Sequence, residues 1–487
     1  MLPQGRTVSA PAPHTQNPAS AAPSVILHLV LGSFHRAHQA VYLHRLHRSG
    51  DTRWVLAGGN TRPDMAETIA ALMAQGGAYT LETVSPALER HYERITSIRT
   101  VVPYDPQLDG LVKVGADPAT RIISFTVTEA GYYLDAANHL DTRHPDLAAD
   151  LERARKGQAG GILYAALAVI LRARMRRGAG PVTLMNCDNL RHNGDRSRRG
   201  LLQFLQLIGD AELLRWVETH TTSPNAMVDR ITPRPTPDVR ERVMAATGVD
   251  DPAALMGESF IQWVIEDRFI AGRPAWEQVG AEMVDSVDAY EEAKIRILNA
   301  THSCIAWAGT LVGYQYIHEG THDAAIRKFG HDYVTDDVIP CLDRPDKPSP
   351  IDLAAYRDVV LERFGNAAIR DTNQRVAMDG FSKIPGFIAP TVRERLGRAE
   401  PIASVAMLPA LFLAFLQRWH RGEVPYEYQD QGMDPAAAHA ICEATDPVAA
   451  FCASTVLWGP NAGDSRLVAA VAVALERVQR FAKEHRA

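Results

Sequence analysis

Short apolar runs alternate with helical patterns along the first half of the chain, and this alternation limits the fold more than any other feature. Val25–Leu31 is apolar apart from His28, as expected for a strand that is buried on both faces. Comparable runs lie at Trp54–Ala57, Ile122–Val127 and Val182–Met185, with helical patterns between them at Ala37–Arg48, Pro63–Gln75 and Ile162–Arg176. This order predicts a doubly wound α/β domain with a parallel sheet.

The pattern changes near Asp288, beyond which helical patterns dominate. They cover Glu291–Gly313, Ile351–Phe364, Pro401–Arg418, Pro435–Glu443 and Ser465–Lys483. We therefore predict an α/β domain over residues 25–287 and a mainly α-helical domain over residues 288–487, which agrees with a length of 487 residues. Residues 1–24 are rich in Pro, Ala and Ser and are predicted to form a flexible tail.

The composition argues against several classes of protein. The net charge of −6 provides no general attraction for nucleic acid. No apolar run reaches the roughly 18 residues of a membrane span, so we expect no membrane contact. The five cysteines show no CxxC spacing. That argues against a disulfide framework and a structural zinc site, and it indicates a reducing compartment such as the cytoplasm.

The first predicted strand runs into the sequence Gly32-Ser33-Phe34-His35-Arg36. A strand, a glycine turn and a helix form the arrangement that binds a pyrophosphate at a helix N-terminus. Val30 stands where the first glycine of such a turn is usual, and a tight turn without a ligand would look the same. Asp64 offers a carboxylate for the ribose and favours NAD, whereas the nearby Arg62 leaves NADP open.

Lys294, Asn299 and His302 stand at i, i+5 and i+8 in the segment KIRILNATH, just after the acidic pair Glu291 and Glu292. On an α-helix these three side chains fall within an arc of roughly 140°. A lysine held in a dry cleft near amide and imidazole groups can transfer protons, because burial brings its pKa towards neutrality. The alternative is an ordinary helix with a solvated lysine.

Further polar segments follow the predicted strands or lie in the second half of the chain. They are Thr128-Glu129-Ala130-Gly131-Tyr132, Cys187-Asp188-Asn189-Leu190, the stretch Pro224–Pro233 that ends in VDRITP, and RVAMDGFSK with Arg375 and Lys383. Each has a structural explanation when taken singly. Asn189 could cap a turn, Asp229 could pair with Arg230, and Arg375 and Lys383 could form a solvated helix face.

Together with FHRAHQA (34–40) and KIRILNATH, these segments resemble, in the same order, the polyol-specific long-chain dehydrogenases of the mannitol dehydrogenase family. The resemblance extends over nearly the whole chain after residue 24, and HSCIAWAGTLVGYQYIHE (302–319) is most similar to the branch that acts on D-arabinitol. It implies a Rossmann-type domain that binds NAD, followed by a helical substrate-binding domain. It also implies an enzyme that oxidises a polyol to a ketose without zinc. The substrate it implies is D-arabinitol, and the product is D-xylulose.

The resemblance further implies residue roles. Lys294 is the expected general base, Asn189 and Asn299 hold the reacting oxygen, and His302 positions the substrate. Asp229, Arg375 and Lys383 are expected to contact other hydroxyl groups of the substrate. Glu291 is expected to connect Lys294 to solvent as a path for the proton. The expected cofactor-binding residues are Gly32, Phe34, Arg36, Asp64, Thr128 and Glu129.

A lysine with two amides can supply the base and the alkoxide stabilisation that many dehydrogenases obtain from zinc. The pairs His35 with His38 and His44 with His47 have a helical spacing that could ligate a metal, but no Cys or acidic ligand accompanies them, so we expect no metal. The alternatives are a mannitol 2-dehydrogenase, a uronate reductase with Arg375 as the carboxylate partner, and a non-catalytic nucleotide sensor, which has no use for a base. The oligomeric state stays open, with a monomer as one option.

Overall fold

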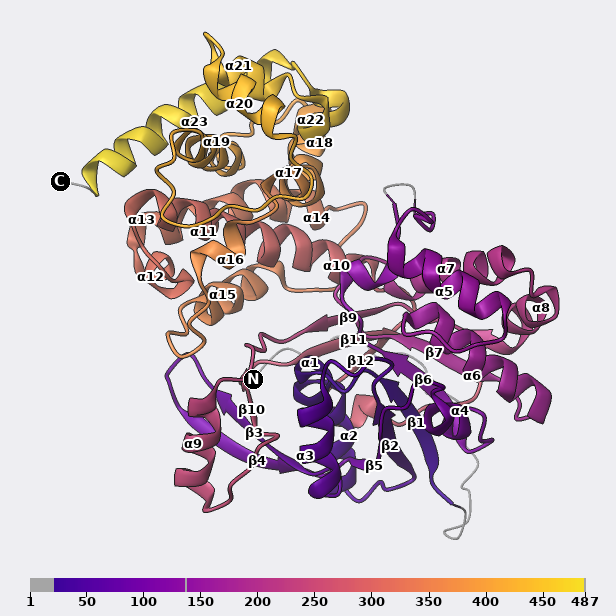
Figure 1. Ribbon diagram of the computed structural model, residues 1–487. Coiled ribbons are helices and arrows are strands. Elements are labelled where there is room, and N and C mark those ends of the chain that lie inside the picture. The colour runs from indigo at the N-terminus through magenta and orange to yellow at the C-terminus, as the bar shows by residue number, and fades with distance from the viewer. Residues whose placement is uncertain (1–21, 136–137, 486–487) are drawn as a thin grey trace.

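The computed structural model describes residues 22–135 and 138–485 and shows an α/β part and a helical part that lie side by side (Figure 1). Of the predicted tail, residues 1–21 lie outside the described part of the chain, and Ser24 already belongs to the first strand. Within the described residues, all named strands lie between Ser24 and Val284, and the elements from Asp288 onwards are helical.

Six parallel strands form the central sheet, in the order β5-β2-β1-β6-β7-β8. Their bounds are β1 (Ser24–Leu29), β2 (Trp54–Gly59), β5 (Ile98–Val102), β6 (Thr120–Phe125), β7 (Val182–Asn186) and β8 (Thr221–Thr222). The predicted doubly wound fold is confirmed. The strand order reverses between β1 and β6, and in sheets of this kind nucleotides bind in the crevice at the carboxyl ends of the two strands on either side of that point.

The central strand β1 contributes to a hydrophobic core on each face of the sheet. Ile26 belongs to the core on one side, whereas Leu27 and Leu29 belong to the core on the other, because successive side chains of a strand point to opposite faces. The helices of this part are α1 (Ser33–Ala37), α2 (Gln39–Arg48), α3 (Ala66–Ala74), α4 (Asp109–Gly115), α5 (Pro145–Arg155), α6 (Leu163–Arg177), α7 (Asn193–Ile208), α8 (Ala211–His220) and α9 (Pro237–Thr247). The predicted helix Ala37–Arg48 is interrupted at His38, where the backbone leaves helical geometry (φ −124°, ψ −86°).

Two small sheets accompany the central one and were not predicted. The first has the order β10-β3-β4 and the second the order β12-β11-β9. Their bounds are β3 (Tyr79–Val84), β4 (Arg90–Ile95), β9 (Ala226–Asp229), β10 (Leu255–Glu258), β11 (Gln262–Glu266) and β12 (Glu282–Val284). β4 reads RHYERI and is largely exposed, so it lacks the apolar run that marks a buried strand. β9 brings the segment VDRITP towards the helical part.

The helical part is built around α19 (Met407–His420), which packs against α11 (Ala300–Val312) and α23 (Ser465–Glu484). Trp307 is completely buried there, as predicted for a core residue, and its indole nitrogen donates to the carbonyl oxygen of Ala377 at 3.2 Å. The predicted helix Pro401–Arg418 begins only at Met407. The other helices are α10 (Asp288–Ala293), α12 (Ile317–His322), α13 (Ala324–Asp332), α14 (Ile339–Leu342), α15 (Leu353–Phe364), α16 (Asn373–Ala377), α17 (Gly380–Lys383), α18 (Ala389–Gly397), α20 (Pro435–Glu443), α21 (Pro447–Cys452) and α22 (Thr455–Trp458).

Three segments of the helical part form π-helical turns, namely Lys294–Asn299, Tyr333–Val338 and Ile384–Ile388. The first connects α10 to α11 and contacts the other two. Hydrogen bonds from i to i+5 widen this turn, so the α-helical arc expected for Lys294, Asn299 and His302 does not apply. Single π turns inside α-helices are frequent at functional sites, and this one contains KIRILN.

The structure bears on the expected state of the cysteines and on the expected absence of a membrane span. The five cysteines are all free thiols. Across the described ranges, none of the helices combines the length and the apolar character that crossing a membrane requires.

Candidate active site

Lys294 lies where the two parts of the chain meet. Its Nζ donates a hydrogen bond to Oδ1 of Asn189 at 2.6 Å and another to the carbonyl oxygen of Val228 at 2.6 Å. Asn189 follows β7 and Val228 lies on β9, so the α/β part supplies both acceptors. Lys294 is only 6% exposed. Burial lowers the pKa of Lys294, and the nearby carboxylate of Asp229 opposes this shift.

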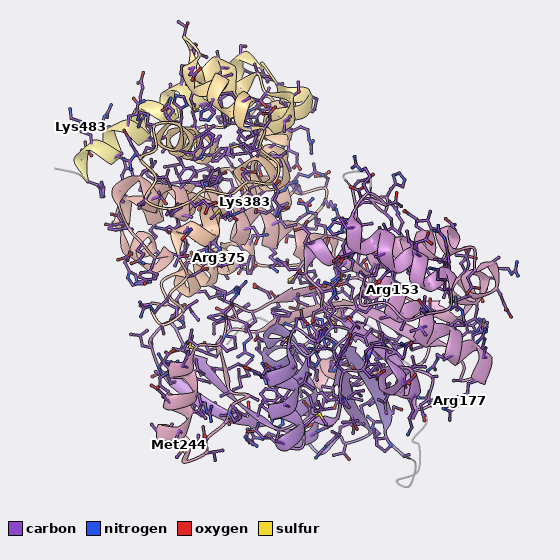
Figure 2. All side chains as sticks on the ribbon, in the orientation of Figure 1. Arg153, Arg177, Met244, Arg375, Lys383 and Lys483 are labelled. Carbon is purple, nitrogen blue, oxygen red and sulfur yellow. The ribbon has the colours of Figure 1, made fainter. Side chains whose placement is uncertain are left out.

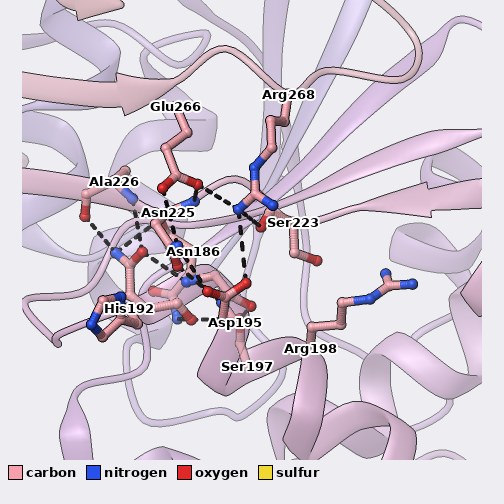
Figure 3. Close-up of polar contacts among 12 residues, drawn as sticks. Asn186, His192, Asp195, Ser197, Arg198, Ser223, Asn225, Ala226, Glu266 and Arg268 are labelled. Atoms are coloured by element: carbon pink, nitrogen blue, oxygen red, sulfur yellow. Dashed lines mark hydrogen bonds and ion pairs between the residues drawn. The ribbon is translucent and has the colours of Figure 1, made fainter. Parts of the chain in front are cut away.

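A polar network ties the loop after β7 to the start of β9 (Figure 3). Its side chains come from the end of β7, the first turn of α7, the entry to β9 and the end of β11 with the residues after it, namely Asn186, Asn193, Asp195, Asn225, Glu266 and Arg268. Asn193 spans the two segments, because its Nδ2 donates to the carbonyl oxygens of Asp188 (3.0 Å) and Ala226 (2.8 Å). The two acceptors of the lysine, Asn189 and Val228, therefore belong to segments that are fixed to each other.

Glu291 lies one turn before Lys294 and is buried. Its carboxylate accepts hydrogen bonds from the backbone N–H of His192, at 3.0 and 3.2 Å. Burial raises the pKa of Glu291 to about 7. His192 and Asp288 continue towards solvent, with 3.6 Å between the imidazole and the carboxylate. Among the described residues, these three side chains form the one group with the spacing of a metal site, since their possible ligand atoms all lie within 4.8 Å of one another.

Asp229 pairs with Arg363 of α15, and not with its neighbour Arg230. The guanidinium donates to both carboxylate oxygens, at 2.7 and 2.9 Å. Burial alone would raise the pKa of Asp229, but the positive charges of Arg363 and Lys294 hold it below the usual value. Arg230 instead donates to the carbonyl oxygens of Ala37 and Glu258. The carboxylate of Asp229 is therefore ionised and firmly oriented beside Lys294.

His302, Arg375 and Lys383 form a second group further along the same helical region; Figure 2 marks the latter two. The His302 ring stacks on Phe364 with 4.3 Å between centroids, and its Nε2 lies 3.4 Å from the carboxylate of Asp371. Asp371 also binds Arg375, whose Nε donates at 2.6 Å.

The lysine of this second group is held by the main chain. Lys383 Nζ donates to the carbonyl oxygen of Val376 at 2.6 Å, and burial lowers the pKa of Lys383 to about 8. Asn299 is half-buried at the end of the first π turn, between Lys294 and His302 along the chain. The structure thus brings Asn189 and Asp229 to Lys294, and Arg375 and Lys383 to His302, whereas Asn299 lies between the two groups along the chain.

A crevice of about 140 Å³ lies at the carboxyl ends of the central strands, and Val30, Asn60, Asp64, Gly131 and Tyr133 are among the residues that line it. Asn60 accepts a hydrogen bond from the backbone N–H of Leu31 at 2.9 Å, while its buried Nδ2 has no partner among the described residues. A Cβ added at Gly32 would come no closer than 3.9 Å to any neighbour, so the turn is open at this point. An orphaned donor and an open turn beside the switch point fit a dinucleotide.

The other residues predicted to bind the cofactor are Phe34, Arg36, Thr128 and Glu129, and they differ in exposure. Phe34 stacks on His38 at 5.0 Å, and Thr128 and Glu129 are exposed where η1 (Glu129–Tyr132) begins. Arg36 points into the interior, where its guanidinium donates to the carbonyl oxygen of Ala253 at 2.5 Å and lies over the ring of Tyr79. The Arg36 side chain is therefore part of the protein interior and does not line the crevice.

Three of the four histidines weighed as metal ligands form hydrogen bonds with the protein, whereas both ring nitrogens of the buried His35 have no hydrogen-bond partner among the described residues. His38 and His47 form hydrogen bonds with the carbonyl oxygens of Gln262 and Trp54, at 2.8 Å each. His44 accepts from the backbone N–H of Thr96. The ring of His35 stacks on His28 at 3.4 Å.

Three residues of the site, Asp188, Glu258 and Arg363, were not predicted from the sequence. Asp188 accepts hydrogen bonds from the backbone N–H groups of Val127 (2.8 Å) and Thr128 (3.0 Å), and so shapes the loop after β6. Arg363 and Glu258 join Asp229 in a buried ion cluster. The position of Asp188 directly before Asn189 was a usable signal, whereas Arg363 is one of several charged residues in an ordinary helical pattern.

Comparisons with known proteins match both parts of the chain. Residues 24–278 match the mannitol dehydrogenase Rossmann domain, and residues 286–479 match the mannitol dehydrogenase C-terminal domain. The chain is 63% identical to a D-arabinitol 4-dehydrogenase of Ralstonia nicotianae, over 96% of this chain and 98% of the relative. It is 55% identical to a D-arabinitol 4-dehydrogenase of Klebsiella pneumoniae, over 91% and 95%. A Pseudomonas fluorescens mannitol 2-dehydrogenase in a ternary complex with NAD and D-mannitol has a TM-score of 0.79 at 31% identity, over 95% and 94%.

Proposed function

Because the chain belongs to the mannitol dehydrogenase family, we propose that it is a polyol dehydrogenase that uses NAD to oxidise a secondary alcohol of D-arabinitol to the ketose D-xylulose. The observation that carries the proposal is the buried amine of Lys294, which is hydrogen-bonded to Asn189 and Val228. The two relatives named for D-arabinitol are more similar than the structure named for mannitol, which supports D-arabinitol as the substrate.

In the proposed reaction, neutral Lys294 accepts the proton of the reacting hydroxyl group. Oδ1 of Asn189 accepts a hydrogen bond from the lysine, which leaves Nδ2 of the same amide as the group that can donate to the reacting oxygen, and Asn299 supplies a second amide. Both amides stabilise the negative charge that develops on this oxygen. In ketose reduction the ammonium form of Lys294 returns the proton to the carbonyl oxygen.

The proton then has to leave the buried amine. Glu291 has a pKa of about 7, so it can both accept and release a proton near neutral pH. His192 and Asp288 lie beyond it and are about half exposed or more. We assign this chain of groups as the path to solvent. In this proposal Lys294 removes the proton from the hydroxyl group and the path carries it to solvent, so proton removal does not require a zinc ion.

The cofactor supplies the hydride acceptor. The turn around Gly32, together with Asn60 and Asp64, would hold its nucleotide half in the crevice. The group of His302, Arg375 and Lys383 would bind hydroxyl groups of the polyol away from the reacting carbon. Asp229, held by Arg363, presents a fixed carboxylate to a further hydroxyl group.

The alternatives are a mannitol 2-dehydrogenase, a uronate reductase and a nucleotide sensor. A uronate requires a free cation in the pocket, but Arg375 is already engaged by Asp371, and this favours a neutral substrate. A sensor has no use for a buried lysine beside the amide of Asn189. The free cysteine thiols are consistent with work in a reducing compartment such as the cytoplasm.

One assay separates these possibilities. NADH formation is measured with D-arabinitol, D-mannitol, D-sorbitol and xylitol in parallel, and the ketose product is identified. We expect the highest kcat/KM with D-arabinitol and D-xylulose as the product. A clear preference for D-mannitol would assign the mannitol 2-dehydrogenase activity instead, and no turnover of any polyol would contradict the proposal.

A further inference from the structure

Arg363 of α15 connects the helical part to two strands of the α/β part. Its guanidinium donates to both oxygens of Asp229 on β9, and to both oxygens of Glu258 on β10 at 2.7 and 3.0 Å. It also lies 3.9 Å from the centre of the Phe260 ring. Arg363 is 3% exposed, so these contacts form without competition from water. Two carboxylates and an aromatic face fix the guanidinium in one orientation.

The carboxylate that Arg363 holds is a close neighbour of the proposed base. Asp229 follows Val228, whose carbonyl oxygen accepts a hydrogen bond from Lys294. Despite this proximity, the contacts of Lys294 within the described ranges are hydrogen bonds to Asn189 and Val228, and no ion pair with Asp229 forms. Both oxygens of Asp229 face Arg363 instead. An ion pair would hold Lys294 as an ammonium group, which cannot accept a proton.

We propose that Arg363 is a positioning residue, which engages both oxygens of Asp229 and so keeps this carboxylate from forming an ion pair with Lys294. The inference rests on the proposed role of Lys294 as the base. It assigns a function to an arginine that touches neither the substrate nor the reacting atoms.

The charges around Lys294 define what removal of Arg363 does. The groups that face the lysine are Asp229 and Glu291, which raise its pKa, and Arg363, which lowers it. His38 is also close, but burial lowers the pKa of His38 to about 3, so this ring stays neutral. Tyr356 of α15 faces Asp229, and burial raises the pKa of its hydroxyl, so it stays neutral too. Without Arg363, the carboxylates of Asp229 and Glu291 remain, and none of these described groups is a cation that opposes them. Glu258, the second carboxylate that Arg363 binds, already has a pKa that burial raises.

The test compares the wild-type protein with Arg363→Met, which retains much of the side-chain volume and removes the guanidinium. The pH dependence of kcat/KM for D-arabinitol oxidation is measured for both. We expect the acidic limb for Arg363→Met to move to higher pH by about one unit or more, so that activity lost at neutral pH returns at alkaline pH. A reduction by the same factor at every pH would show a purely structural role and overturn the proposal.

Two further variants isolate the effect. Asp229→Asn combined with Arg363→Met removes the competing carboxylate as well, and we expect the alkaline shift to disappear. Arg357→Met removes a second arginine of α15, which pairs with Asp358 and hydrogen-bonds to Thr335, and we expect no shift. A shift of equal size in the double variant or in Arg357→Met would contradict the proposal.

Folding and function are controlled separately. If Arg363→Met does not fold, Arg363→Lys replaces it, since lysine keeps the charge but cannot bind both carboxylates as a fork. An intermediate alkaline shift supports the proposal, and an unshifted profile overturns it. The titration of Lys294 is also followed by NMR after ¹³C-methylation of the amines. A higher lysine pKa in the variant supports the positioning role even if D-arabinitol is not a substrate, so failure of this inference and failure of the proposed function can be told apart.

Discussion

The amine of Lys294 and the amide oxygen of Asn189 lie 2.6 Å apart, although 105 positions separate them in the sequence. One residue belongs to a π turn at the start of the helical part, and the other to a loop at the end of a central strand. The contact forms only when the two parts of the chain pack together. The hydrogen-bonded environment of the proposed base is therefore created by the tertiary fold. Substitutions that loosen the contact between the two parts should lower the reaction rate even when they lie far from Lys294.

The first prediction concerns pH. Burial lowers the pKa of Lys294, and only the neutral amine can accept a proton. The rate of polyol oxidation should therefore rise as the pH rises through this lowered pKa. Ketose reduction needs the ammonium form and should fall over the same range. Profiles of kcat/KM in both directions check this, and profiles with the same slope in both directions contradict it.

The second prediction concerns Glu291, whose pKa is raised to about 7 by burial. Glu291→Gln keeps the shape of the side chain but cannot carry a proton. We expect kcat to fall on the order of tenfold or more with little change in KM, because proton release slows while binding is retained. Glu292→Gln is the matched control, since Glu292 pairs with Arg191 and Arg296 and is not part of the path. Equal effects in the two variants would argue against the proton path.

The third prediction concerns the choice of cofactor. Asp64 lines the crevice, and its carboxylate should repel the 2′-phosphate of NADP. In Asp64→Ala, the ratio of kcat/KM with NADP to that with NAD should increase by on the order of tenfold. Glu67→Ala is the control, because Glu67 lies in the exposed first turn of α3 and does not line the crevice. An unchanged ratio in Asp64→Ala would remove Asp64 from the cofactor site.

Four strands of the central sheet, β1, β2, β6 and β7, could be predicted because they are buried on both faces, whereas the partly exposed β5 and the two-residue β8 were not predicted. Val25–Leu31 and Val182–Met185 have the apolar runs that such strands need, and each lies in the sheet. β4 could not be found in this way, since it lies in a small sheet and is largely polar. The same reasoning found long amphipathic helices such as α23 but could not find the π turns, because a hydrophobic pattern does not show whether a backbone hydrogen bond spans four residues or five.

The candidate site shows a similar division. KIRILNATH and the segments after the strands could be selected from residue types and order, and the structure places Lys294 beside Asn189 as that order suggests. The pairing of Asp229 with Arg363 joins residues 134 positions apart. Spacing along the chain carries no information about such a contact, so Arg230 was considered as the partner. Arg36 is a comparable case, since only the fold reveals that its side chain faces inwards.

The fourth prediction concerns Val30, whose backbone adopts a φ of +73°. This region costs an ordinary L-residue roughly 1–2 kcal/mol, and a β-branched residue is especially unfavourable there. Glycine adopts it freely but loses about 0.5–1 kcal/mol through the entropy of the unfolded chain. Val30→Gly should therefore leave the thermal stability unchanged or higher. Val25→Gly is the control, because Val25 is also half-buried but lies in strand β1 without a positive φ, and it should be clearly destabilised. A loss in Val30→Gly as large as that in Val25→Gly would contradict strain at this turn.

The most direct measurement is the turnover of D-arabinitol by Lys294→Ala. We expect kcat for oxidation to fall on the order of 10²–10⁴, while NADH affinity changes little, because only the proton acceptor is removed. An added primary amine should restore part of the rate. Lys328→Ala, which removes an exposed lysine that pairs with Asp332, should retain full activity. If Lys294→Ala keeps most of the wild-type activity, Lys294 is not the base and the central claim is wrong.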